Sequence, residues 1–266
     1  ATVWDEDGAS SSASSWFETG LMNPDPRLTA WGGATWIGGG EEDLVLYSHY
    51  LPIFDLEYTV AIEEGSTRAG FVFGANDARL MDRNKNVHQL QARRDESYIE
   101  LELDVSAVDG TPNGLARLKV YRVGYKGTDS KEVPFATFAV LPSVINLGNK
   151  HAPHHVAVTV LFGEISIRLD GNDSFARKPE GREETSGPPG PPFGKQVPGE
   201  SVNLNPMGRG GDYLTFGLLC DMGFSARAGQ KATFWDVAVK NNRAPRATLF
   251  REDLSGARYG GLYAAP

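Results

Sequence analysis

The sequence has a single cysteine, and this excludes several kinds of cysteine chemistry. With Cys220 alone among 266 residues, no disulfide can form within the chain. Cys220 follows two leucines, so we expect it to be a small buried side chain. The sequence also has no G-x-S-x-G motif and no plausible Cys–His pair. The common arrangements for nucleophilic catalysis are therefore not indicated.

Long apolar runs, helical periodicity and an excess of basic residues are missing as well. No stretch of 18 apolar residues is present, so no membrane-spanning helix is predicted. A formal net charge of −8 argues against a nucleic-acid or anionic-membrane partner and favours a neutral one. No segment keeps a 3.6-residue apolar period, whereas 31 glycines and 16 prolines indicate many turns. We therefore expect few helices.

The clearest pattern that is present is a two-residue alternation from His154 to Gly171. Apolar residues alternate on both sides of Phe162-Gly163, which predicts a β-hairpin with one apolar face. Such a face needs a second layer to cover it, and residues 229–240 offer one, with a slipped register that suggests a β-bulge. These segments predict a two-sheet β-sandwich.

Other segments alternate in the same way. Residues 54–62 and 68–74 are joined by a short Glu-Glu-Gly-Ser turn, which predicts a second hairpin. Residues 98–105 and 115–125 predict a third, and residues 135–141 a further strand. The fold class predicted is all-β, with two antiparallel sheets and few helices.

Three acidic residues at alternate positions, Glu100, Glu102 and Asp104, form the sharpest chemical feature. Residues two apart on a strand project from one face about 7 Å apart, close to the carboxyl separation in glycosidases. Glu100 and Glu102 are thus candidates for a catalytic pair, as in the strand of laminarinase-type glucanases that this segment superficially resembles. The spacing departs from that family's E-x-D-x-x-E pattern. The alternative is a strand that keeps its charged face in water.

The loop from Gly74 to Arg94 is rich in amide, carboxylate and guanidinium groups, which suit hydroxyl-rich ligands. Tyr121 is a candidate for stacking on a sugar from an exposed strand face. Asp77 and Asp82 are calcium candidates, although the loop is not an EF-hand. His154 and His155 point to opposite faces of a strand, so a histidine metal site is not indicated. The candidate carbohydrate-binding residues are Asn76, Asp77, Arg83, Asn84, His88, Gln91 and Tyr121.

The hairpin at 154–171 and the segment ATFWDVAV resemble concanavalin A-like, or laminin G-like, jelly-roll sandwiches. A broader set of segments resembles the non-catalytic N-terminal region of bacterial α-L-rhamnosidases of glycoside hydrolase family 78. The resemblance implies an accessory sandwich with no catalytic site of its own, because hydrolysis in that family occurs in a downstream helical barrel. The segments, in order, are VWDEDG, WFETGL, ATWIG, GFVFGANDARLMDRNKN, YIELELDVS, GLARLKVYRVGY, NLNPMGRGGDY and FWDVAVKNNRAP.

This resemblance also implies a domain organisation. Residues 1–30 would be the remnant of a preceding fibronectin-like domain with a connector, and residues 31–245 the sandwich. Residues 178–200, rich in proline and glycine, are expected to form a flexible loop, and residues 246–266 an exit toward a following domain. The chain begins Ala1-Thr2, and we expect a processed or excised piece of a longer protein.

The expected function is that of an accessory module of an α-L-rhamnosidase-like hydrolase that binds a rhamnose-containing glycan. Its other partners would be domains of the same polypeptide, and the resemblance implies a secreted or periplasmic bacterial protein. No cofactor is required by this function, with calcium left open. Two alternatives stand beside it: a stand-alone glycosidase using Glu100 and Glu102, and a purely structural spacer.

Overall fold

The structure is a computed structural model, and its backbone divides into two compact units, residues 1–37 and 38–266. It describes residues 2–4, 10–12, 43–49, 51–86, 89–94, 96–177, 199–207, 219–242 and 247–252. In the first unit, β1 (Thr2–Trp4) pairs antiparallel with β2 (Ser10–Ser12). The assignment of residues 1–30 to a preceding domain stays a prediction. Among the described residues, no helix is long and apolar enough to cross a membrane.

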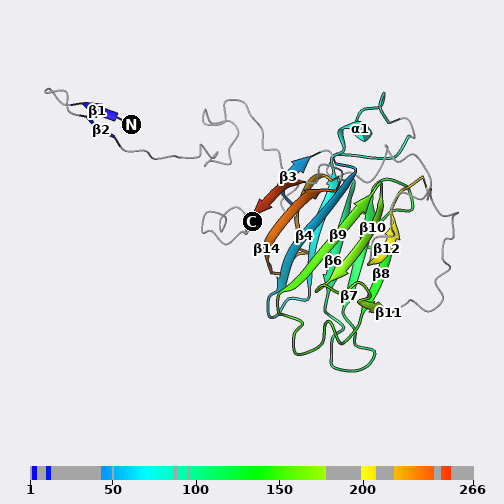
Figure 1. The fold of residues 1–266 in the computed structure, drawn as a ribbon. Coiled ribbons are helices and arrows are strands. Elements are labelled where there is room, and N and C mark those ends of the chain that lie inside the picture. Colours follow the sequence, from blue (N-terminus) through cyan, green and yellow to red (C-terminus); the bar gives the residue numbers. More distant parts are fainter. Residues whose placement is uncertain are drawn as a thin grey trace. The chain divides into compact units, whose positions relative to one another are not determined.

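The second unit contains two antiparallel sheets, which confirms the predicted all-β sandwich with few helices (Figure 1). One sheet has six strands in the order β12-β10-β9-β4-β14-β15. Its strands are β4 (Ile53–Ile62), β9 (His154–Leu161), β10 (Glu164–Leu169), β12 (Glu200–Asn203), β14 (Ala232–Asn241) and β15 (Ala247–Glu252).

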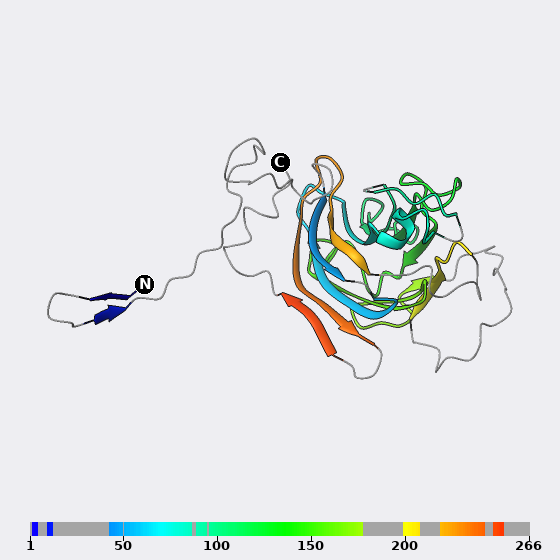
Figure 2. The same cartoon turned by 90° about the horizontal axis from the view of Figure 1, so that it is seen from above.

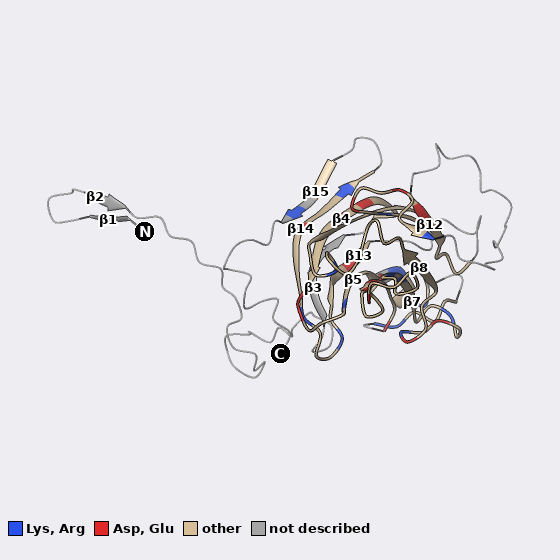
Figure 3. Ribbon diagram, turned by 90° about the horizontal axis from the view of Figure 1, so that it is seen from below, with Lys and Arg blue, Asp and Glu red and all other residues tan. Residues whose placement is uncertain are grey.

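The other sheet has seven strands in the order β11-β8-β7-β6-β5-β13-β3. Its strands are β3 (Asp43–His49), β5 (Arg68–Ala75), β6 (Tyr98–Asp104), β7 (Arg117–Val123), β8 (Ala136–Val140), β11 (Ala176–Arg177) and β13 (Cys220–Ser225). Figure 3, in which the sandwich is seen from below, separates the layer of β4, β12, β14 and β15 from that of β3, β5, β7, β8 and β13. Figure 2 shows that β4 and β14 are strongly curved.

The hairpin predicted at residues 154–171 is confirmed as β9 and β10, which pair in register from Leu161↔Glu164 to Val156↔Leu169. Phe162 and Gly163 have φ values of 49° and 89°. Positive φ at both turn residues is the geometry of a type I′ turn, whose twist matches that of the strands it joins. The pairing of β6 with β7 confirms the third predicted hairpin.

Two predictions about strand pairing are wrong. The strands β4 and β5 follow one another in sequence but belong to different sheets, so they form an arch across the sandwich and not a hairpin. Strand β14 does not cover the β9–β10 hairpin from a second layer. It lies in the same sheet, hydrogen-bonded to β4, and the cover comes from the seven-stranded sheet. The predicted β-bulge of β14 is confirmed, because its register against β4 shifts between Trp235 and Ala238.

The core lies between the two sheets and is rich in aromatic pairs that join them. Tyr58 of β4 stacks on Phe71 of β5 with ring centroids 4.5 Å apart. Phe224 of β13 stacks on Phe234 of β14 at 4.2 Å. Each pair takes one ring from each sheet, so the apolar faces predicted by the alternation meet here. The seven-stranded sheet therefore presents its other face outward.

Candidate functional site

The loop that follows β5 begins with a turn built from polar side chains. Asn76, in the left-handed region at φ 59°, donates from Nδ2 to Asp221 Oδ2 at 3.0 Å. Asp77 is buried and caps the single-turn helix α1 (Ala78–Met81), because its Oδ1 accepts from Arg79 N at 2.9 Å. Arg79 also forms an ion pair with Asp77 at 3.1 Å. The first part of the loop is thus fixed to strand β13 of the seven-stranded sheet.

Asn86 holds the second part of the loop closed. Its Nδ2 donates to the carbonyl oxygens of Leu80 at 3.2 Å and Leu90 at 2.8 Å, and its Oδ1 accepts from Leu90 N at 2.9 Å. Both leucines are buried in the core. Between these anchors, Arg83 and Asn84 are exposed. Their side chains therefore project into solvent from a loop that is closed by hydrogen bonds.

The remaining predicted binding residues lie in different settings. Gln91 is exposed, while its backbone N–H donates to Tyr125 O at 3.0 Å. His88 lies outside the described residues. Of the candidate set, Arg83, Asn84 and Gln91 share an exposed loop, whereas Asn76 and Asp77 serve as its internal supports. An exposed guanidinium group with two amides supplies donors and acceptors suited to hydroxyl groups.

The two calcium candidates are engaged by cations of the protein. Asp77 pairs with Arg79, and Asp82 pairs with Lys85 at 3.4 Å. Asp82 Oδ1 also accepts from Asn84 N at 2.9 Å. In the part of the chain that the structure describes, no three His, Cys, Asp or Glu side chains gather as a metal site would require.

The acidic row of β6 is buried, so the prediction of a solvated face is wrong. Glu100, Glu102 and Asp104 are 4%, 1% and 2% exposed, although they point away from the core. The physical reason is that cationic side chains from neighbouring strands and from the β13–β14 turn lie over them. Gly70 also contributes, because a Cβ atom at this position would collide with the Glu100 carboxylate. The Glu100 carboxylate therefore packs closely against the backbone of β5.

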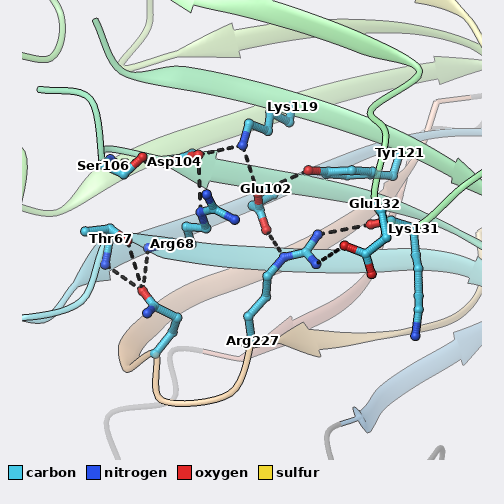
Figure 4. Close-up of polar contacts among 11 residues, drawn as sticks. Thr67, Arg68, Glu102, Asp104, Ser106, Lys119, Tyr121, Lys131, Glu132 and Arg227 are labelled. Carbon is cyan, nitrogen blue, oxygen red and sulfur yellow. Dashed lines mark hydrogen bonds and ion pairs between the residues drawn. The ribbon is translucent and has the colours of Figure 1, made fainter. Parts of the chain in front are cut away.

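Two cationic side chains and one hydroxyl group contact the Glu102 carboxylate (Figure 4). Arg227 Nε lies 2.6 Å from Oε2, Lys119 Nζ 3.5 Å from Oε1, and Tyr121 Oη donates to Oε1 at 3.3 Å. Arg227 further donates to Lys131 O at 3.2 Å. Both carboxylate oxygens of Glu102 therefore have partners within the protein. A catalytic nucleophile or acid would instead leave an oxygen accessible to the substrate.

Asp104 completes the cluster. Lys119 Nζ lies 2.5 Å and Arg68 Nε 3.3 Å from Asp104 Oδ2, and Ser106 N donates to Oδ1 at 2.9 Å. Burial acts to raise the pKa of Asp104, but the hydrogen bonds from Lys119 and Ser106 outweigh it and lower the pKa below its ordinary value. Asp104 is therefore held as a carboxylate.

The prediction of an exposed stacking ring at Tyr121 is wrong. Its side chain is 2% exposed, and the guanidinium carbon of Arg227 lies 5.5 Å from the ring centroid. Burial, followed by the charge of Glu102, raises the pKa of Tyr121 to about 12. The phenol therefore stays protonated and donates its hydrogen bond to Glu102.

Sequence reasoning missed Arg68, Lys119 and Arg227. Lys119 lies directly opposite Glu102 in the β6–β7 register, so the predicted hairpin contained a signal for this pair. No local signal points to Arg227, which is 125 residues away from Glu102 in the chain. Its contact depends on the turn between β13 and β14.

Two further titratable groups are structural. His154 Nδ1 lies 2.7 Å from Asp170 Oδ2, and Nε2 lies 3.0 Å from Asn149 O. Burial, followed by the charge of Asp77, raises the pKa of the Cys220 thiol far above its ordinary value. Cys220 is buried, as the sequence predicted.

Comparisons with known proteins add little to this description. No protein-family model matches the chain, and no curated protein matches it. Among solved structures, the chain is similar to the carbohydrate binding module CBM66 from Bacillus subtilis, at 12% identity and a TM-score of 0.38. The match covers 77% of this chain and 90% of that one. At this level of similarity it assigns no ligand to the chain.

Proposed function

We propose that this chain is a non-catalytic carbohydrate-binding β-sandwich whose binding groups are Arg83, Asn84 and Gln91. The observation that carries the proposal is their exposure on a loop closed by the side-chain hydrogen bonds of Asn86 and Asp77. Hydrogen bonds that already restrain residues 77–86 in the free protein reduce the conformational entropy lost on binding, which favours affinity for a small polar ligand. Rigid scaffolds with such loops commonly carry binding.

The proposal also includes the kind of longer protein to which this chain belongs. On the sequence resemblance, the chain is an accessory module of a secreted or periplasmic α-L-rhamnosidase-like hydrolase, and the ligand is a rhamnose-containing glycan. The engaged state of Glu102 supports a module without its own hydrolytic pair. Binding at the loop would hold the hydrolase near its substrate.

A titration followed by amide chemical shifts tests this function. L-Rhamnose and rhamno-oligosaccharides are added to the isotope-labelled chain, and the expected result is saturable shifts at Arg83, Asn84 and Gln91. The double variant Arg83→Ala with Asn84→Ala should weaken binding about tenfold or more, because each lost polar group costs about 1 kcal/mol.

The matched control is Asn113→Ala. Asn113 is exposed on the loop that joins β6 to β7, at the opposite end of β6 from the binding loop. Its substitution should leave the affinity unchanged. Absence of shifts in the loop across all the sugars would contradict binding and favour the structural spacer. Hydrolysis of a rhamnoside or β-glucan that is lost in Glu100→Gln would favour the glycosidase instead.

A further inference from the structure

The outer face of the seven-stranded sheet carries a row of arginines that crosses five strands. Strand registers place five residues side by side in the order Arg68, Asp104, Arg117, Ala139 and Arg177. Directly paired residues project from the same face of a sheet. The ion pair of Arg68 with Asp104 at 3.3 Å confirms that these two side chains share the outer face. The row therefore places three arginines along one line across the sheet.

Within this row the cations are more accessible than the carboxylate, because the Arg68 side chain is 38% exposed and that of Asp104 2%, although the whole chain carries −8. Lys119, in the neighbouring cross-strand row, is only 15% exposed and is engaged by Glu102 and Asp104, so it neutralises these carboxylates. The carboxylates of these two rows are Glu102 and Asp104, and they are 1% and 2% exposed. Arg177, by contrast, is exposed. An approaching ligand meets cations first, and the carboxylates lie beneath them.

The row has features of a ligand site. Arg177 is held in place because its Nη2 donates to Pro112 O at 3.1 Å. Ala139, which has a small side chain, stands between Arg117 and Arg177. With strands about 4.8 Å apart, Arg68 and Arg177 lie about 10 Å on either side of Arg117. Such a line fits an extended ligand with repeated negative groups.

We propose that this row binds an extended glycan that carries carboxylate groups, such as a uronate polymer. The planar guanidinium fork matches a carboxylate with two parallel hydrogen bonds. This site lies at the Asp104 end of β6, whereas the loop of the proposed function precedes Tyr98. The two proposals are therefore separable.

Calorimetric titration of the full chain with an oligogalacturonate tests the site, with the same oligomer after reduction of its carboxyl groups as the neutral probe. The double variant Arg117→Gln with Arg177→Gln should bind at least about tenfold more weakly, since charged hydrogen bonds are lost. The control is Arg93→Gln with Arg94→Gln, which makes the same charge change on exposed residues of the other loop. It should change the affinity less than about twofold.

Each other outcome contradicts the proposal. A folded wild-type chain that does not bind oligogalacturonate, or binds the reduced oligomer equally well, overturns it. Equal weakening in the control variant would mean that only net charge matters. A single-stranded DNA oligomer that binds as tightly would identify a general polyanion surface. Circular dichroism checks that each variant is folded, and the single variant Arg117→Lys should show an intermediate loss. None of these results bears on the titration of the other loop with rhamnosides, which tests the proposed function separately.

Discussion

Replacing Glu102 with glutamine tests whether the ion cluster on the outer sheet face stabilises the sandwich. The substitution keeps the shape of the side chain and removes its charge. Glu102 is 1% exposed and contacts Arg227 at 2.6 Å, Lys119 at 3.5 Å and Tyr121 at 3.3 Å. Arg227 and Lys119 would then each lose one of the carboxylates that they contact, so the free energy of unfolding should fall.

The magnitude follows from what each cation retains. Removing one member of a buried ion pair costs about 3–5 kcal/mol when its partner is left without compensation. Lys119 keeps Asp104 at 2.5 Å, and the Arg227 side chain is 30% exposed and therefore partly solvated. We therefore expect a loss of about 2–3 kcal/mol, which lowers Tm by roughly 5–10 °C for a domain of this size.

Urea unfolding at pH 7 measures this loss, and Glu132→Gln is the control. Glu132 lies 3.8 Å from the same Arg227 but its side chain is 71% exposed, so its substitution should cost less than about 0.5 kcal/mol. If the two variants have equal stability, the cluster does not stabilise the fold and the reasoning from burial is refuted.

Three further predictions concern backbone strain, acid stability and thiol reactivity. Gly124→Ala should destabilise the chain by about 3 kcal/mol in urea unfolding, and Gly229→Ala by only about 1 kcal/mol. Both glycines have positive φ, but only at Gly124 would the new Cβ atom collide with backbone atoms. Equal losses of stability in the two variants would contradict this reasoning. Burial acts to raise the pKa of Asp170, but hydrogen bonds, chiefly from His154, outweigh it and lower the pKa. A lowered folded-state pKa contributes stability above about pH 4 that is lost as pH falls through the folded pKa, so Asp170→Asn should show a shallower loss of stability on acidification, and an unchanged slope would refute it. Cys220 should react with a thiol reagent only after unfolding, since it is buried with a raised pKa, and rapid labelling of the native chain would contradict the burial.

The local pattern of the sequence was sufficient to predict most strands and their buried faces. β4 and β10 alternate between buried and partly buried residues along their whole length, as expected for strands with one face on the core. The turn Phe162-Gly163 was equally local, because two residues between alternating runs leave a hairpin as the simplest connection. These features depend on neighbours in sequence.

The partner of each strand depended on contacts between distant residues. The short turn after β4 suggested a hairpin, yet β4 pairs with β9 and β14 while β5 pairs with β6 and β13. Alternation gives the same signal whichever sheet a strand joins. The choice is made by the aromatic core, where Tyr58 and Phe71 must face one another across the two layers.

The candidate sites divide in the same way. The sequence by itself identified the polar loop with Arg83 and Asn84, because exposed polar residues between strands need no distant partner. It also identified the acidic row of β6 but placed that row in water. Only the tertiary structure brought Arg227 over Glu102 and lined up Arg117 with Arg177 across β8. The physical reason is that burial of a charge and alignment across a sheet are both properties of neighbouring strands, which the order of residues along one strand does not contain.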